Sequence, residues 1–463
     1  MSTPREVADT LSGFVYRELA FDRTGRPVDP GQAAAVRRLA DLPEPITDLI
    51  VLAHGWNNDE AEAAELYRRL AASLAAVQAS DAWDASPLAG RRLGLVGVFW
   101  PSKKFADEEL IPGGAAGLGD DDEALRSRID ELRDAFDAPA AESLLAAGAA
   151  LSTALDDEPA RLAEFVALTR ALVPAPAGGA GAADDADADD LFAGLDADAV
   201  AERLLDPAPD DLALWQLAVP ADTGRAALAT DGPAAVPDVG TAAFLGVPAS
   251  PRAAARRWLN YTTYYQMKRR ASLVAQSGLA PVLAEVVGPG QRLHLVGHSF
   301  GARLVTATAA APSCPAVTSI SLLQAAFSHY SFAKDWQPGS DGAFRAAIAP
   351  GRLLGPMIVT HTRNDHAVGT AYAVASRLAR QTASGIGDAD SPYGGLGSNG
   401  ALRTPEAVAG ALLPAGGTYD LRPGHVHNLL ADEYVKDHGD VTGLQVANAV
   451  LSAVTAPPHA PAG

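Results

Sequence analysis

One serine of the chain lies in a pattern that could make its hydroxyl group a nucleophile. Gly297-His298-Ser299-Phe300-Gly301 matches the five-residue pattern Gly-x-Ser-x-Gly. A serine hydroxyl needs a neighbouring base and a backbone turn that exposes it and presents an N–H group to a developing oxyanion. Gly297 and Gly301 leave room for such a turn between a strand and a helix. We therefore predict that Ser299 attacks an acyl carbonyl; the alternative is an accidental Gly-Ser turn.

A second pattern, earlier in the chain, could complete the oxyanion site. His54-Gly55-Trp56 follows directly on the apolar run at residues 47–53. A turn at the end of a buried strand can supply a second backbone N–H to the same oxyanion. We expect the N–H groups of Trp56 and Phe300 to form the oxyanion hole, and His54 fits an ordinary turn residue equally well.

A serine on such a turn is followed along the chain by an acid and then by a histidine. Asp365 fits the acid best because it comes just after the apolar run at residues 357–362. Asp365 also fits the N-cap of the next predicted helix, at residues 367–380. Asp335, after the preceding apolar run, is the reserve candidate.

Three late histidines are candidates for the base, namely His425, His427 and His438. His438 is preferred because it lies in a loop just before the terminal helix predicted at residues 441–454. His425 and His427 lie in a turn that could flank the pocket, and they stay open as alternatives. Their spacing also resembles a metal pair, but no clear third ligand accompanies them. We predict neither a metal site nor a cofactor.

The elements that position these residues alternate between strands and helices. Short apolar runs, typical of strands buried on both faces, predict strands at residues 47–53, 92–100, 292–297, 317–327 and 357–362. Helical spacing predicts helices at residues 61–77, 302–311, 367–380 and 441–454. Such alternation indicates an α/β fold with a mostly parallel central sheet flanked by helices.

The alternation is interrupted between residues 103 and 252. This segment is helix-prone, rich in Ala and Leu, and acidic, which predicts a large helical insertion, a possible cap, between two halves of the core at residues 1–102 and 253–463. Its acidic run at residues 184–190 is interpreted as a solvated loop. A second loop is predicted at residues 384–401, where Gly, Ser and Asp are frequent.

Composition limits the partners and the location. The formal net charge of −20 disfavours binding to nucleic acid or to anionic lipid. The single cysteine, Cys314, excludes an intrachain disulfide, and the amino terminus lacks the apolar core of a signal peptide. No apolar run is long enough to span a membrane. A cytoplasmic location is therefore expected.

The motifs together resemble the α/β-hydrolase superfamily, within it an uncharacterised bacterial branch that is lipase- and esterase-like. The blocks that carry the resemblance are HGW at residues 54–56, FWPS at residues 99–102 and GHSFG at residues 297–301. It covers about residues 45–105 and 253–455. The resemblance implies an α/β-hydrolase fold, in which insertions near the sheet often act as a cap that selects substrate. Here the insertion enters after the strand that ends near Trp100, which is not the commonest cap position.

Two hypotheses on function follow. In the first, the protein is a serine hydrolase of a small-molecule acyl substrate with the triad Ser299, Asp365 and His438. Carboxylesterase, lipase, thioesterase, acyltransferase and peptidase activities all fit this triad. In the second, the fold is a binding or scaffolding module that uses the acidic insertion to hold a protein partner. Reaction with a serine-directed fluorophosphonate would distinguish the two.

Overall fold

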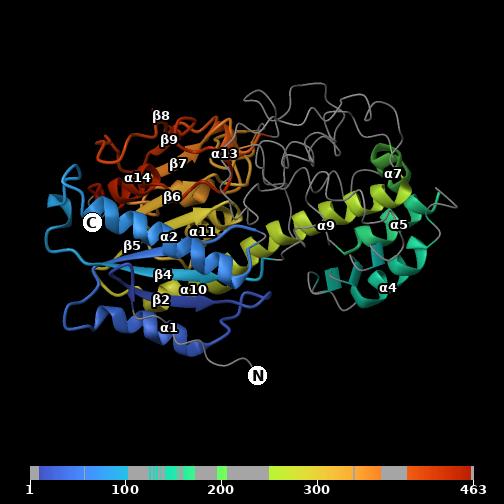
Figure 1. The fold of residues 1–463 in the computed structure, drawn as a ribbon, viewed down its shortest axis with the longest axis horizontal. Helices are drawn as coiled ribbons and strands as arrows, with labels where there is room; N and C mark the ends of the chain where they lie inside the picture. The colour runs from blue at the N-terminus through green and yellow to red at the C-terminus, as the bar shows by residue number, and fades with distance from the viewer. Residues whose placement is uncertain are drawn as a thin grey trace, which may run out of the picture.

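One large sheet forms the centre of the molecule (Figure 1). The computed structural model describes residues 10–56, 58–102, 125–126, 129–130, 132–133, 136, 141–153, 155, 160–172, 196–205, 250–336, 339–365 and 394–459. The strands found there are β1 (Thr10–Leu11), β2 (Phe14–Ala20), β3 (Asp48–Ala53), β4 (Leu93–Phe99), β5 (Arg292–His298), β6 (Ser319–Leu323), β7 (Met357–His361), β8 (Ala407–Ala411) and β9 (Val426–Leu430). These nine strands lie in the order β1-β2-β4-β3-β5-β6-β7-β9-β8. β1 pairs antiparallel with β2, and the other pairs are parallel.

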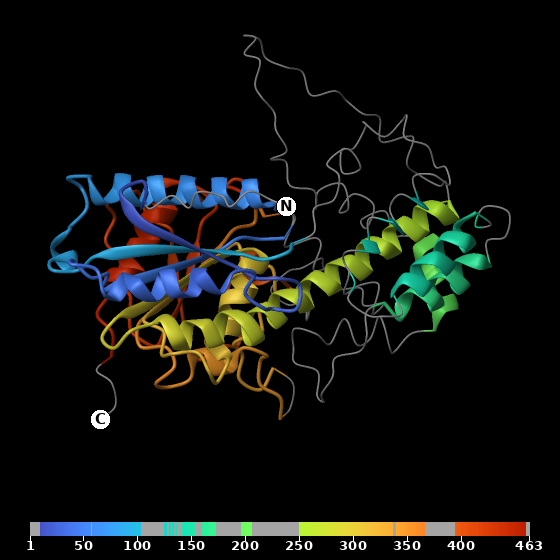
Figure 2. The ribbon, with the colours of Figure 1, turned by 90° about the horizontal axis from the view of Figure 1, so that it is seen from below.

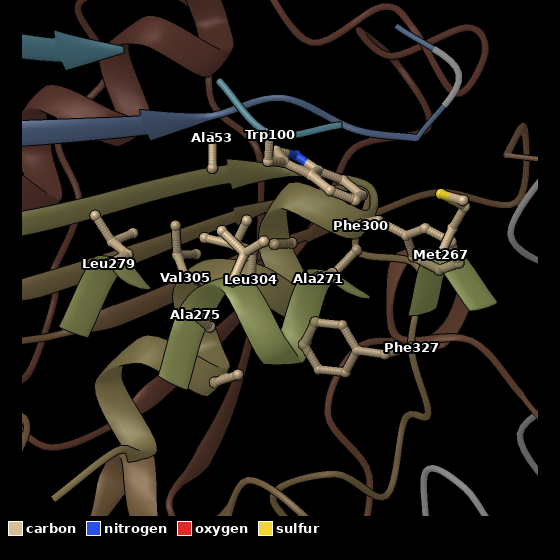
Figure 3. Close-up of a cluster of buried hydrophobic side chains, with 14 of the residues drawn as sticks. Ala53, Trp100, Met267, Ala271, Ala275, Leu279, Phe300, Leu304, Val305 and Phe327 are labelled. Atoms are coloured by element: carbon tan, nitrogen blue, oxygen red, sulfur yellow. The ribbon is translucent and has the colours of Figure 1, made fainter. Parts of the chain in front are cut away.

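Helices cover both faces of this sheet, as the second view shows (Figure 2). One face carries α2 (Glu60–Gln78) and α14 (Leu444–Thr455), whose apolar side chains form one buried cluster with the strands. The other face carries α1 (Pro30–Arg37), α9 (Pro251–Val274), the π-helical turn η6 (Ala275–Leu279), α10 (Ala280–Val286) and α11 (Phe300–Ala310). Figure 3 shows Met267, Ala271 and Leu304 in the cluster on this second face.

The central strands are apolar because both of their faces are covered. Every residue of β3 and β4 is buried, as expected for parallel strands between two layers of helices. Asp48, the first residue of β3, is the polar exception. Its carboxylate pairs with Arg91 and with the buried ring of His294, so the charge is compensated inside the protein.

The described part of the insertion is helical. It contains α4 (Ala141–Ser152), α5 (Arg161–Arg170) and α7 (Ala197–Leu205), which lie around the amino-terminal part of α9, away from the sheet (Figures 1 and 2). The indole Nε1 of Trp258, on α9, donates a hydrogen bond of 2.8 Å to Oγ1 of Thr169, on α5. α9 therefore crosses the boundary predicted at residue 253 and joins the insertion to the core.

α9 is the longest of the described helices, at 24 residues. Despite this length, none of the helices in the described ranges is apolar enough over a sufficient length to cross a bilayer. The remaining short helical elements are η1 (Arg38–Ala40), η2 (Ser86–Leu88), η7 (Arg345–Ile348) and α13 (Leu396–Asn399).

The strands predicted from apolar runs are confirmed as β3, β4, β5, β6 and β7. The strand predicted at residues 317–327 was too long, because the chain turns after Leu323 at a positive φ of Gln324. The loop predicted at residues 384–401 was wrong for its last part, where α13 is largely buried and Gly397 lies against the backbone of Gln324. The acidic run at residues 184–190 and the predicted helix at residues 367–380 lie outside the described residues.

Four of the described strands were not predicted. β1 has only two residues, and β2 mixes polar and apolar residues because it is only partly buried, so neither has a continuous apolar run. β8 consists of Ala, Val and Gly, and β9 follows directly on a turn-forming Pro-Gly segment. Their pairing is decided by neighbouring strands rather than by their own pattern.

Candidate functional site

The direction in which the chain moves across the sheet reverses between β3 and β5. From β3 the chain passes through α2 to β4 on one side, and from β5 it passes through α11 to β6 on the other. α2 and α11 cover opposite faces, so β3 and β5 form a topological switch point, and α/β sheets bind ligands outside the carboxyl ends of the strands at such a point. The predicted oxyanion turn follows β3, and Ser299 follows β5.

Ser299 occupies a strained turn between β5 and α11. Its φ of 57° and ψ of −123° are rare for a residue with a Cβ atom and cost about 1–3 kcal/mol. Its N–H donates to the carbonyl of Leu323 at 3.1 Å, and its carbonyl accepts from the N–H of Ala326 at 3.3 Å. The end of β6 and the chain that follows it therefore hold the turn, which places Ser299 at the positive end of α11.

Three glycines allow this turn to lie against its neighbours. A Cβ atom on Gly297 would lie 2.5 Å from the backbone N of Ala302, and one on Gly301 would collide with the carbonyl of Ala53. A Cβ atom on Gly55 would lie 2.8 Å from Cβ and 3.3 Å from Oγ of Ser299. The structure therefore brings the two predicted motifs into direct contact.

His54 fixes the orientation of the oxyanion turn. Its Nε2 accepts from the N–H of Trp100 at 3.3 Å, so the ring proton lies on Nδ1, which donates to the carbonyl of Gly55 at 2.9 Å. Burial lowers the pKa of His54 to about 4, which keeps the ring neutral. Because the C=O and N–H of one trans peptide point in opposite directions, the held carbonyl of Gly55 sets the direction of the Trp56 N–H.

Trp56 and Phe300, the two predicted oxyanion residues, lie side by side. Their rings are stacked with centroids 5.8 Å apart, and Tyr264 of α9 contacts both at 5.9 and 5.2 Å. Phe300 is the first residue of α11, so its N–H is among those that the helix itself leaves unbonded. The aromatic side chain of Tyr264 thus braces both halves of the predicted oxyanion hole.

Asp365 and His438 form a hydrogen-bonded pair at the same carboxyl end of the sheet. Nδ1 of His438 lies 2.9 Å from Oδ2 of Asp365; the carboxylate is fully buried, and 13% of the imidazole is exposed. Burial alone would lower the pKa of His438, but the charge and hydrogen bond of Asp365 outweigh it, so the pKa is raised. With Nδ1 donating to Asp365, Nε2 of the neutral ring can accept a proton.

The loops that carry this pair are bonded to each other. Asp432, in the connection from β9 to α14, accepts hydrogen bonds from Oγ1 of Thr362 at 2.8 Å and from the N–H of Arg363 at 2.9 Å. The side chain of Asn364 donates to the carbonyl of Val435 at 2.9 Å. These contacts hold the segment before Asp365 against the segment before His438.

His298 connects the base to the nucleophile turn. Its Nε2 donates to the carbonyl oxygen of His438 at 2.8 Å, and the two rings lie 4.8 Å apart. Burial, followed by the nearby His438, lowers the pKa of His298 to about 3, so this donor is neutral. The residue directly before Ser299 therefore contacts the residue predicted as the base.

The alternative residues lie elsewhere. His425 and His427 are at the amino-terminal end of β9, so His427 is about 10 Å along the strand from the carboxyl edge of the sheet. Nε2 of His427 accepts from the N–H of Arg422 at 2.9 Å. Asp335 is exposed, and its N–H donates to the side chain of Asp341. In the described ranges, no group of three His, Cys, Asp or Glu side chains could hold a metal ion.

Two buried residues at the site were missed in the sequence, Gln324 and Thr360. Nε2 of Gln324 lies 3.3 Å from Oδ2 of Asp365, and Thr360 donates to Oε1 of Gln324 at 2.8 Å. Both lie within apolar runs that predict strands, at residues 317–327 and 357–362. Gln324 is a long polar side chain between Leu323 and Ala325, and this interruption of the apolar residues was the available signal.

The comparisons with protein-family models, curated proteins and solved structures found no match to this chain. The features of the site that bear on its chemistry are a strained serine at a helix start, two turns in contact, and a buried Asp-His pair connected to them through His298.

Proposed function

We propose that this protein is a serine hydrolase of the α/β-hydrolase type, acting on an ester-like acyl bond. The observation that carries the proposal is the hydrogen bond between Asp365 and His438, next to the left-handed turn of Ser299. The acid and the base come from separate loops, one after β7 and one between β9 and α14. A buried acid that orients a histidine beside a strained serine is the arrangement that acyl transfer requires.

The reaction follows from the roles of these groups. Oγ of Ser299 attacks the acyl carbonyl carbon, and Nε2 of His438 takes the hydroxyl proton. The N–H groups of Trp56 and Phe300 stabilise the oxyanion of the tetrahedral intermediate. His438 then protonates the leaving oxygen, which leaves an acyl group on Ser299. Water, activated by the same histidine, hydrolyses that acyl-enzyme and restores the serine.

The support for this assignment is electrostatic as well as geometric. The imidazolium formed during the reaction lies against the buried carboxylate of Asp365, which stabilises its charge. The raised pKa of His438 indicates the same stabilisation in the resting protein. A small-molecule ester is the simplest substrate, and thioesters or amides need the same groups.

The experiment is labelling by a fluorophosphonate probe, followed by mass spectrometry of the modified peptide. We expect the wild type to be labelled at Ser299 and Ser299→Ala to show no labelling. Ser80→Ala is the matched control, because Ser80 is exposed beyond the far end of α2. Hydrolysis of p-nitrophenyl esters of graded chain length should follow the labelling. A folded wild type that does not react, or a Ser299→Ala variant that keeps esterase activity, would refute the proposal.

A further inference from the structure

The carboxylate of Asp365 receives a second hydrogen bond besides that of His438. Gln324, the residue after β6, is fully buried and has a φ of 44°. Its Nε2 lies 3.3 Å from Oδ2 of Asp365 and 3.2 Å from the carbonyl oxygen of Gly397. Because both neighbours are hydrogen-bond acceptors, the NH2 end of the amide must face them.

Thr360, on the adjacent strand β7, fixes the other end of this amide. Its Oγ1 donates to Oε1 of Gln324 at 2.8 Å and accepts from the backbone N–H of Gln324 at 3.2 Å. Thr360 is fully buried, so its hydroxyl is shielded from bulk solvent. The hydroxyl therefore allows only one orientation of the amide, the one that donates to Asp365.

We infer that Gln324 is a positioning residue of the active site, which holds the Asp365 carboxylate against His438 and is itself oriented by Thr360. The inference rests on the proposed function. A buried carboxylate that loses a donor to Oδ2 is less restrained in rotation about its Cβ–Cγ bond, and Oδ2 can then move away from the imidazole. Two donors on the same oxygen hold it in place, and they also offset the loss of hydration of the charge.

The first measurement is the pH dependence of the rate constant for fluorophosphonate labelling. Gln324→Met keeps the length of the side chain without its donor, and we expect labelling about tenfold slower or more. Gln324→Glu should label well only at pH values where the introduced carboxyl group is protonated, because its O–H then replaces the amide donor. The ionised form repels Asp365, so its rate should fall again at higher pH, a fall that we do not expect for the wild type.

The second measurement does not need the reaction. The titration of the His438 ring is followed by NMR, and the signal is assigned by its loss in His438→Gln. His298 and Asp437 also influence the pKa of this ring, and both residues are unchanged in the Gln324 variants. In Gln324→Glu the midpoint should move upward by at least half a pH unit. If the wild type is not labelled, the proposed function fails, and this titration still tests the contact.

Thr360 provides the matched pair. Thr360→Ser keeps the hydroxyl and should label within about threefold of the wild type, whereas Thr360→Val should be as slow as Gln324→Met. Circular dichroism across the pH range confirms that each variant is folded. Labelling of Gln324→Met within twofold of the wild type, or an unchanged His438 titration in Gln324→Glu, would overturn the inference.

Discussion

The carbonyl oxygen of His438 accepts a hydrogen bond of 2.8 Å from Nε2 of His298, the residue directly before Ser299. This contact links the nucleophile turn to the loop of the proposed base, and it involves neither Oγ of Ser299 nor Nε2 of His438. Asp365 holds the ring of His438 from one side, and His298 holds its backbone from another. The position of the base is therefore fixed at two points.

The first prediction tests this contact. His298→Leu removes the donor, so the loop that carries His438 gains freedom, and we expect fluorophosphonate labelling to slow by about tenfold or more. His298→Gln can place an N–H near the position of Nε2 and should recover most of the rate. Equal rates for the Leu and Gln variants would show that the hydrogen bond is unimportant for the position of the base.

The second prediction concerns Asp365. His438 accepts a proton only when neutral, so the rate of the wild type should rise with pH through a midpoint above 6.5, the ordinary pKa of histidine. In Asp365→Asn the burial of His438 is no longer offset, so the midpoint should move to lower pH. The plateau should fall by about three to four orders of magnitude, because the imidazole loses its orientation. Asp335→Asn is the control and should keep the wild-type profile; loss of activity there would favour the reserve acid.

The third prediction concerns the contact between the two motifs. The added Cβ of Gly55→Ala would lie 3.3 Å from Oγ of Ser299, where the oxyanion turn must approach the nucleophile. We expect ester hydrolysis to fall by about a hundredfold, since small displacements of reacting groups have effects of this size. Gly288→Ala, whose Cβ would meet Ala40 at 3.4 Å, is the control for the glycine replacement itself. A fully active Gly55→Ala would argue against Trp56 as an oxyanion donor.

The fourth prediction concerns stability, at the opposite edge of the sheet. Burial alone would raise the pKa of Asp48, but hydrogen bonds from His294, Arg91 and Thr47 outweigh it, so the pKa lies well below its ordinary value. A depressed pKa stabilises the fold above the unfolded pKa of about 3.9, and this contribution is lost as the pH falls toward the folded value.

Asp48→Asn should therefore lower the free energy of unfolding by about 3 kcal/mol or more at pH 7, because Arg91 keeps a buried charge without its partner. The difference from the wild type should shrink below about pH 4. Urea unfolding at several pH values measures both effects, and Asp81→Asn, at an exposed residue, should stay within about 0.5 kcal/mol. A difference that does not change with pH would contradict the assigned role of the Asp48 charge.

The sequence by itself was sufficient for the central strands and for the two glycine motifs. Parallel strands covered on both faces must be apolar throughout, so β3, β4 and β5 are visible as short apolar runs. A Cβ atom on Gly297 or Gly301 would collide with neighbouring backbone, so these positions need glycine. The residue type alone therefore indicates the close packing. These patterns involve residues close together in the chain, so a single sequence is enough to show them.

Only the tertiary structure decided which distant residues meet. The preference for His438 over His425 and His427 depended on a loop reaching back over the sheet, and it was the strand register that placed His427 at the opposite edge. The role of Gln324 could not be predicted, because its contact with Asp365 depends on the turn at its positive φ and on Thr360 from the next strand. Such contacts join residues far apart in the chain, and no spacing in the sequence encodes them.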